Sequence, residues 1–272
     1  MTNRSVRRTR RTLQLAGAGT AALLALTACS SSGGSSTAAS DKSSATKLSG
    51  TVTVFAAASL KESFTALGRQ FEKQHPGTTV RFNFAGSDAL AASITSGAPA
   101  DVFAAASPKT MAVVTDGKDA AGTPVTFVRN RLEIATLPGN PGHVSSLKDL
   151  TEPGLKVVLC DRSVPCGAAA QKALAAGGLK LTPVSYEQDV KAALNKVELK
   201  EADAAVVYTT DVKAAGGKVE GVQFPESADA INDYPIAPLK NGGNAAAAKA
   251  FIGLVRSAEG QKVLGEAGFL KP

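Results

Sequence analysis

Residues 52–67 read VTVFAAASLKESFTAL and combine a short strand with the beginning of a helix. The strand-like run VTVF leads into three alanines, after which Ser59 stands where a helix should start. From there the apolar residues follow helical spacing: Leu60, Phe64, Leu67 and Phe71. Serine is a favoured N-cap. Because free N–H groups and the helix dipole meet at such a start, this stretch predicts a place where an anion could bind.

The same order of strand, serine and helix occurs twice more along the chain. Val80–Phe84 precedes Ser87, and Ala100–Ala104 precedes Ser107, which is followed by Pro108 at the position where a helix tolerates proline best. Three such units predict a parallel sheet with its helix starts on one edge. Open α/β sheets bind their ligands at that edge.

The second half of the chain repeats this pattern after a long extended segment at 126–137. A second extended segment, 231–239 (INDYPIAPL), carries two prolines and suits an edge or crossing strand. We therefore predict an α/β protein with two doubly wound lobes joined by two crossing strands, and a cleft that closes by a hinge. The first lobe is expected at 48–127 plus 231–272, because chain ends usually lie close together. The second lobe is expected at 128–230.

The N-terminal region has the features of an export signal. Residues 1–28 combine arginines with a short apolar run, which predicts a signal peptide. The sequence does not decide between Sec and twin-arginine export. The run Leu26-Thr27-Ala28-Cys29 resembles the bacterial lipobox, which implies cleavage before Cys29 and a lipid on its sulfur. Residues 29–47 are rich in Ser, Gly and Ala and predict a flexible tether. We expect an exported protein anchored by lipid to the outer face of the cell membrane.

The basic charge of the chain comes mostly from its first residues. The formal net charge is +7, with 30 Lys and Arg against 23 Asp and Glu. Five arginines lie within residues 1–28, so the remaining chain is close to balanced. The sequence therefore predicts no nucleic-acid partner.

Two cysteines lie close together in LCDRSVPCG, at Cys160 and Cys166. In an exported protein a disulfide between them is the expected state. A metal site is the alternative, but two cysteines without a nearby histidine provide too few ligands. The disulfide would fix the loop before the following helix.

Several segments resemble the periplasmic molybdate-binding proteins of molybdate ABC importers, and the likeness runs in order over roughly residues 50–272. These segments are FAAASL (55–60), FAGSDALAASITSGAPADVFAAA (84–106), VPCG (164–167), DVKAAL (189–194) and VVYTTD (206–211). The resemblance implies a type II periplasmic-binding-protein fold. It also implies molybdate or tungstate held between the lobes, a membrane permease as partner, a monomer, and no cofactor.

The resemblance also implies a set of binding residues in this chain. They are Ser59, Ser87, Cys166, Val190 and Tyr208. The serines would offer hydroxyl and amide groups, Cys166 and Val190 their backbone amides, and Tyr208 its phenol. Two positions depart from the family pattern. Cys166 replaces a commoner alanine, and Asp88 follows Ser87 directly, so its charge must point away from the anion.

Neutral donors suit such a ligand. Molybdate near pH 7 is fully deprotonated and only accepts hydrogen bonds. Each hydrogen bond to a charged group contributes roughly 1.5–3 kcal/mol. About seven pre-oriented donors would therefore support sub-micromolar binding after the costs of desolvation and closure.

Other anions of the same fold remain alternatives. Sulfate differs from molybdate mainly in size. Phosphate keeps a proton and would need an acceptor, for which the chain offers Asp88, Asp161, Asp189 and Asp211. Ferric-ion binding is disfavoured because the tyrosines lie scattered along the sequence: Tyr186, Tyr208 and Tyr234.

Functions of other classes fit the sequence less well. A serine hydrolase would need a nucleophile elbow of the form G-x-S-x-G, which is missing, and a general base. The two histidines, His75 and His143, stand in turn-like contexts. We therefore expect no enzyme activity. A purely structural lipoprotein would bind no small anion, and a thermal-shift assay would distinguish it.

Overall fold

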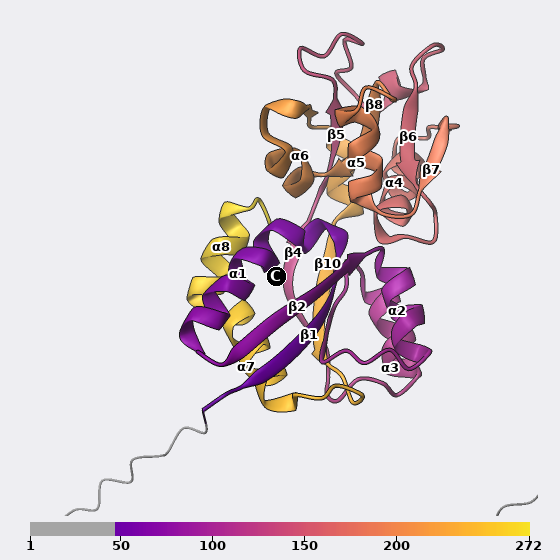
Figure 1. Ribbon diagram of the computed structural model, residues 1–272. Helices are drawn as coiled ribbons and strands as arrows, with labels where there is room; N and C mark the ends of the chain where they lie inside the picture. Colours follow the sequence, from indigo (N-terminus) through magenta and orange to yellow (C-terminus); the bar gives the residue numbers. More distant parts are fainter. Residues whose placement is uncertain (1–46) are drawn as a thin grey trace, which may run out of the picture. The chain divides into compact units, whose positions relative to one another are not determined.

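The computed structural model describes residues 47–272, which form two α/β lobes (Figure 1). The predicted signal peptide, Cys29 and the tether up to residue 46 lie outside the described residues. The first lobe is built on a five-stranded sheet of order β2-β1-β3-β10-β4. Its strands are β1 (Gly50–Ala57), β2 (Thr78–Ala85), β3 (Val102–Ala104), β4 (Val125–Asn130) and β10 (Asn232–Pro238).

The predicted parallel arrangement of the first three strands is confirmed, but the sheet as a whole is mixed. Strand β1 pairs in parallel with β2 and β3, whereas β10 pairs antiparallel with both β3 and β4. The expectation that the proline-rich segment would avoid a central position is therefore wrong. The pairing register shifts between Tyr234 and Pro235, so the proline that cannot donate a hydrogen bond falls at an irregularity.

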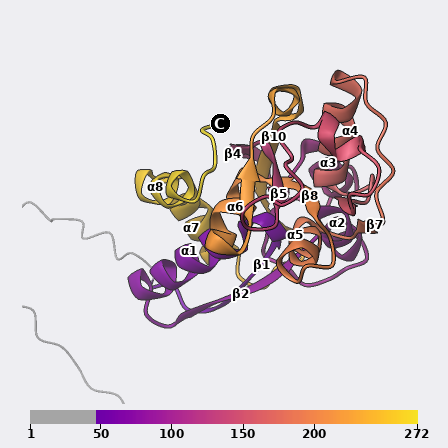
Figure 2. The same ribbon diagram turned by 90° about the horizontal axis from the view of Figure 1, so that it is seen from above.

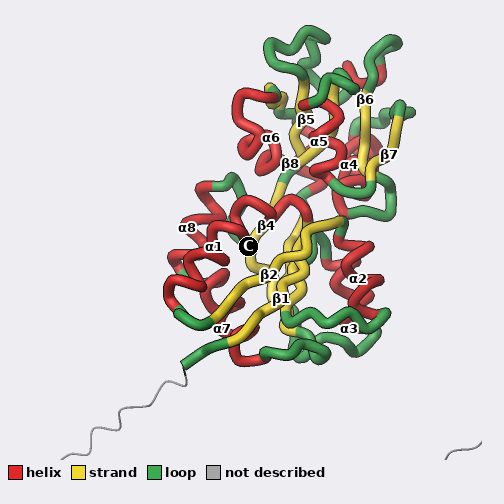
Figure 3. Tube along the Cα trace, in the orientation of Figure 1, coloured by secondary structure: helices red, strands yellow, loops and turns green. Residues whose placement is uncertain are grey.

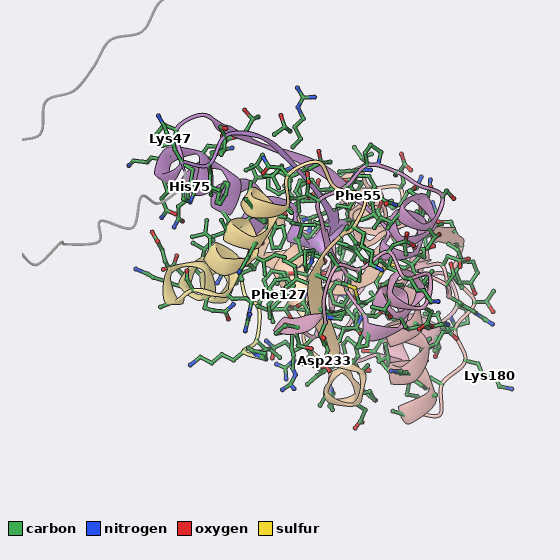
Figure 4. The ribbon with its side chains drawn as sticks, turned by 90° about the horizontal axis from the view of Figure 1, so that it is seen from below. Lys47, Phe55, His75, Phe127, Lys180 and Asp233 are labelled. Carbon is green, nitrogen blue, oxygen red and sulfur yellow. A yellow bond between two sulfur atoms is a disulfide. The ribbon has the colours of Figure 1, made fainter. Side chains whose placement is uncertain are left out.

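Helices cover both faces of the first sheet, as Figures 1 and 2 show. One face carries α1 (Lys61–Gln74), α7 (Ala245–Arg256) and α8 (Ala258–Glu266), and the other carries α2 (Ser87–Thr95) and α3 (Pro108–Asp116). The apolar spacing of α1 places Phe64 and Phe71 inside, where both pack against Phe251. Phe127 of β4 joins them in the interior (Figure 4). This aromatic cluster anchors the C-terminal helices to the first lobe.

The second lobe has its own sheet of order β7-β6-β8-β5-β9. The strands are β5 (Leu132–Thr136), β6 (Val157–Cys160), β7 (Ser185–Glu187), β8 (Ala204–Tyr208) and β9 (Glu220–Val222). The helices are α4 (Pro165–Ala176), α5 (Val190–Glu198) and α6 (Thr209–Ala215). Figure 3 shows helices beside the strands in both lobes, with β7 at the margin of the second lobe. The predicted α/β class with two wound lobes is confirmed.

The chain passes between the lobes next to β4 and β10. Arg131 alone separates β4 from β5, so one extended segment serves both sheets. β4 pairs with β10 as far as Asn130, whereas the predicted boundary lay at 127/128. The predicted domain limits themselves stay a prediction. Among residues 47–272, no helix has the length and apolar character needed to cross a membrane.

The disulfide expected between Cys160 and Cys166 is present. It joins the end of β6 to the first turn of α4, and the two Cα atoms are 5.8 Å apart. The chain turns tightly here, because a Cβ atom at Gly167 would overlap the carbonyl oxygen of Asp161. The disulfide therefore holds the start of α4 against the end of a buried strand.

Candidate anion-binding site

One small cavity between the lobes brings all the predicted binding residues together. Its volume is about 10 Å³, close to the least that can hold one water molecule. The first lobe contributes Ser59 and Ser87, and the second lobe contributes Cys166, Val190 and Tyr208. All five side chains are at most 4% exposed. Segments that are up to 149 positions apart in the sequence thus share one enclosed space.

Several helix starts lie around this cavity. A 3-10 turn at Ala58–Leu60, and helices α2, α4 and α5, all begin at residues that line it. Helix α6 follows directly after Tyr208. The first N–H groups of a helix have no acceptor within it, and the helix dipole is positive at that end. The arrangement favours an anion. Among the described residues 47–272, no lysine or arginine lines the cavity.

Neither of the two serines in the lining is the N-cap residue of a helix. Ser59 lies within the 3-10 turn, and Leu60 is the N-cap residue of α1, so the expected capping by Ser59 is wrong. Its Oγ instead lies 2.8 Å from Oη of Tyr234. Ser87 is the first residue of α2, after Gly86, and its Oγ accepts the N–H of Ala106 at 3.0 Å. The hydroxyl proton of Ser87 thus remains free to donate.

The phenol of Tyr208 is buried and held by an asparagine. Tyr208 is 1% exposed, and its Oη accepts a hydrogen bond from Nδ2 of Asn232 at 2.7 Å. Burial raises the pKa of Tyr208 well above its ordinary value, so the phenol stays protonated.

The tyrosines are less scattered in space than in sequence. The rings of Tyr208 and Tyr234 lie 6.1 Å apart, edge to face. Iron-binding phenols must lose their protons, whereas burial raises the pKa of both rings. Residues 47–272 also hold no cluster of three His, Cys, Asp or Glu residues suited to a metal ion. The tyrosine pair therefore belongs to a donor network.

One carboxylate lines the cavity, that of Asp189. Its Oδ1 accepts the N–H groups of Lys191 and Ala192 at 2.8 and 2.9 Å, so Asp189 is the N-cap of α5. Strand β7 ends at Glu187, and helix α5 begins at Val190, directly after Asp189. The side chain of Asp189 is thus occupied by its own helix.

The other acidic candidates lie outside the lining. Asp88, Asp161 and Asp211 do not line the cavity. Oδ2 of Asp88 lies 3.5 Å from Oγ of Ser163, which belongs to the second lobe. Asp161 binds the backbone and hydroxyl of the same serine. Oδ1 of Asp88 is buried without a hydrogen-bond partner among the described residues, so the expectation that its charge points away from the anion stays a prediction.

A cluster of charges lies beside the start of α5. Nζ of Lys191 is 3.1 Å from Oδ1 of Asp211 and 3.0 Å from Oε2 of Glu62. Asp211 is fully buried, and its Oδ2 accepts the N–H of Tyr208 at 3.2 Å. Burial raises the pKa of Asp211 from 3.8 to about 6, although the ammonium of Lys191 opposes this shift. Lys191 thus links both lobes next to the cavity.

The structure adds residues that the sequence did not single out. Asn130 and Asn232 hold the buried phenols, Lys191 bridges the lobes, and Gly86 lets them approach. No sequence motif marks the two asparagines, because each acts through a partner more than 20 positions away. Only the central position of β10 brings them to the site.

A larger hollow of about 700 Å³ lies elsewhere on the first lobe, beside α3. Its lining includes Met111, Pro124 and the lysines Lys118 and Lys240. None of the five predicted binding residues lines it. Its size alone does not make it the better candidate, because all of its lining residues belong to the first lobe and it does not lie between the two lobes.

Two α/β lobes that enclose a small, donor-lined cavity define a binding protein that captures a small ligand between its halves. This class agrees with the comparison to known families. The chain belongs to the bacterial extracellular solute-binding proteins, whose family model matches residues 52–270.

Individual relatives agree with this assignment. The molybdate-binding protein ModA of Mycobacterium tuberculosis H37Rv is 44% identical over 239 residues, covering 88% of this chain and 92% of the relative. The periplasmic molybdate-binding protein of Azotobacter vinelandii has a similar structure, with a TM-score of 0.71, 22% identity, and coverage of 81% and 99%. The sulfate-binding protein SubI of M. tuberculosis aligns with a TM-score of 0.68 and 19% identity, over 80% and 86% of the two chains. At such identities the last two show the fold alone.

Proposed function

We propose that this protein captures molybdate or tungstate outside the cytoplasm and delivers it to the membrane permease of an ABC importer. The binding residues are Ser59, Ser87, Cys166, Val190 and Tyr208. The observation that supports this most directly is that all five line one buried cavity. The 44% identity to a molybdate-binding relative supports the choice of ligand.

The donors of the site match a fully deprotonated oxyanion. The oxygen of Ser87 already accepts a hydrogen bond from the backbone, and so does that of Tyr208 from Asn232. The hydroxyl proton of Ser87 can therefore go to a ligand that only accepts, and the proton of Tyr208 can go to such a ligand or to the neighbouring oxygen of Tyr234. Amides at the starts of α4 and α5 add further donors, through Cys166 and Val190.

The size of the cavity implies a movement of the lobes. A tetrahedral oxyanion is larger than one water molecule, and the cavity measures about 10 Å³. We infer that the lobes separate to admit the ligand and then close around it. The short links at Arg131 and before β10 allow such a hinge.

The remaining features of the proposed function concern the whole protein. We propose that a lipid on Cys29 anchors it to the membrane, that it acts as a monomer, and that it catalyses no reaction. The family consists of solute-binding proteins, which supports binding in place of catalysis.

Calorimetric titration tests the ligand. We expect sub-micromolar binding of molybdate and tungstate at pH 7.5, and at least 100-fold weaker binding of sulfate and phosphate. Equal or tighter binding of sulfate would exclude the proposal. A thermal-shift assay with the same anions would exclude any ligand of this class if the melting temperature did not change.

Phosphate is the second candidate, because Asp189 lines the cavity and could accept the proton of hydrogen phosphate. Its carboxylate is already bound to two backbone amides, which disfavours this role. The variant Asp189→Asn separates the two ligands. For a molybdate site we expect affinity to stay equal or improve, whereas a phosphate site would lose at least tenfold.

A further inference from the structure

Two buried asparagines face each other on the strands that connect the lobes. Asn130 of β4 and Asn232 of β10 are register partners, with 0% and 7% exposure. Neither residue lines the cavity. Each one instead donates to the phenol of a buried tyrosine, Asn130 to Tyr234 and Asn232 to Tyr208.

The contacts of Asn232 fix the direction of its hydrogen bond to Tyr208. Nδ2 lies 3.0 Å from the carbonyl oxygen of Ala106, in the first lobe, and 3.3 Å from that of Pro165, in the second. Carbonyl oxygens only accept, so the amide nitrogen must face them. An amide nitrogen cannot accept a proton. The oxygen of Tyr208, 2.7 Å from Nδ2, therefore accepts, and its own proton needs another partner.

Asn130 is oriented in a similar way. Its Oδ1 accepts the N–H of Arg131 at 3.0 Å, which turns Nδ2 toward Oγ1 of Thr210 and Oη of Tyr234. The distances from Nδ2 to these two oxygens are 2.9 and 3.3 Å. Tyr234 in turn contacts Oγ of Ser59 at 2.8 Å. Both asparagines thus donate hydrogen bonds to buried phenols from positions outside the cavity lining.

The hydrogen bonds from the two asparagines decide which hydroxyl protons remain available to a ligand in the cavity. The hydroxyls of Ser59, Tyr208 and Tyr234 carry three protons between them, because burial keeps both phenols protonated. Tyr234 neighbours the other two hydroxyls, so contacts within the group use at most two protons. The hydrogen bonds of residues 47–272 give this group no carbonyl or carboxylate acceptor. Whenever Tyr234 donates to one of its two neighbours, at least one proton on the lining hydroxyls of Ser59 and Tyr208 is therefore left for a ligand in the cavity.

We propose that Asn130 and Asn232 are positioning residues that force these hydroxyls to act as donors and thereby select fully deprotonated oxyanions. This inference rests on the proposed function. An anion that keeps a proton, such as hydrogen phosphate, would place that proton next to a hydroxyl proton that points into the cavity. The two protons would repel each other, and neither would find an acceptor. Sites with buried polar groups reject ligands that leave those groups unpaired.

Two substitutions at Asn232 test the proposal. Asn232→Leu removes the donor without adding charge, so the phenol of Tyr208 can turn its proton toward a backbone carbonyl. We expect molybdate affinity to fall about 10- to 100-fold, as for the loss of one hydrogen bond to a charged group. Phosphate affinity should fall much less, which lowers the selectivity for molybdate at least fivefold. A defect of packing alone would weaken both anions equally.

Asn232→Asp gives a second, independent readout. At pH 8 the carboxylate accepts the phenol proton, and molybdate affinity should fall at least 100-fold. At pH 6 a protonated carboxyl can donate as the amide did, and we expect at least a tenfold recovery. The ionisable groups near this position are Tyr208, Tyr234 and Asp211, together with Lys191, which pairs with Asp211. They are present in the wild type too, and its profile, measured in parallel, removes their contribution.

Asn140→Asp is the matched control, because Asn140 also bonds a carbonyl oxygen through Nδ2 but lies far from the lining. It should leave affinity, selectivity and pH profile unchanged. If Asn232→Leu keeps the wild-type selectivity, or Asn232→Asp shows no recovery at pH 6, the proposal is wrong. If the wild type itself does not bind molybdate, the proposed function fails instead.

Discussion

Ser59 shows how one side chain can serve a site without capping its helix. Its Oγ contacts Tyr234 at 2.8 Å, while the residue itself lines the cavity. We expect Ser59→Ala to weaken molybdate binding by about 1–3 kcal/mol, or roughly 5- to 150-fold, because one hydrogen bond to a charged ligand is lost. Calorimetric titration measures this change.

Ser63→Ala is a suitable control for that experiment. Ser63 is similarly buried and lies in the first turn of α1, directly after the 3-10 turn that holds Ser59, but its Oγ donates to the carbonyl oxygen of Leu60 and does not line the cavity. Its affinity for molybdate should match the wild type. Unchanged affinity in both variants would show that the hydroxyl of Ser59 does not bind the ligand.

Asp211 makes stability depend on pH in an unusual direction. Burial raises its pKa from 3.8 to about 6, so the folded protein holds this proton more tightly than the unfolded chain does. The contribution of Asp211 to stability is therefore greatest at acid pH and falls as the pH rises through about 4 to 6. An asparagine at this position does not titrate, so its contribution to stability does not fall over this pH range.

We expect Asp211→Asn to gain stability relative to the wild type between pH 4 and pH 7, by roughly 3 kcal/mol at most. Urea unfolding at several pH values measures the difference. Asp149→Asn is the contrasting case, because hydrogen bonds from Ser145 lower the pKa of Asp149. That variant should lose stability relative to the wild type as the pH rises. A difference for Asp211→Asn that does not change with pH would contradict the expectation.

At the scale of elements, the start of α2 comes very close to the opposite lobe. A Cβ atom at Gly86 would lie 2.5 Å from the carbonyl oxygen of Gln188. The backbone angles of Gly86, φ −56° and ψ 135°, suit any residue. Glycine is thus required by the approach of the two lobes and not by local conformation.

We therefore expect Gly86→Ala to fold normally but close poorly, with at least a tenfold loss of molybdate affinity. Its melting temperature without ligand should stay within a few degrees of the wild type. Gly253→Ala is the control, because a Cβ atom at that position in α7 would meet open space. Binding by Gly86→Ala at wild-type affinity would show that closure does not require this contact.

The elements differ in how well the sequence predicts them. The three strand–helix units of the first lobe were predictable, because their apolar periodicity acts locally. Of the three serines only Ser107 is an N-cap, and its Oγ accepts the N–H of Thr110. The central place of β10 was not predictable, because Pro235 argues against it and only the register shift resolves the conflict. The five predicted binding residues came from a family resemblance. The asparagines behind them depend on contacts between strands that are distant in sequence.

On the scale of the whole molecule, Lys191 connects the lobes outside the cavity. Its ammonium pairs with Glu62 on α1 and with the buried Asp211 on α6. We expect Glu62→Gln to speed molybdate release by up to about fivefold at low salt, because an exposed pair contributes at most about 1 kcal/mol. Stopped-flow fluorescence or a competition assay can measure the rate.

The effect should shrink at high salt, since screening weakens exposed pairs. Glu201→Gln provides the control, because Glu201 is 51% exposed against 50% for Glu62 and pairs with Lys196 inside the second lobe. It should leave the release rate unchanged. Equal effects of the two variants would show that the pair across the lobes has no special role.

The position of β10 between β3 and β4 also bears on how the protein is made. A strand that emerges near the end of synthesis fills the middle of a sheet whose other members emerge first. Residues 132–222, by contrast, contain every strand of the other sheet. The first lobe, whose first strands are synthesised earliest, can therefore be completed only after all strands of the second lobe have been synthesised.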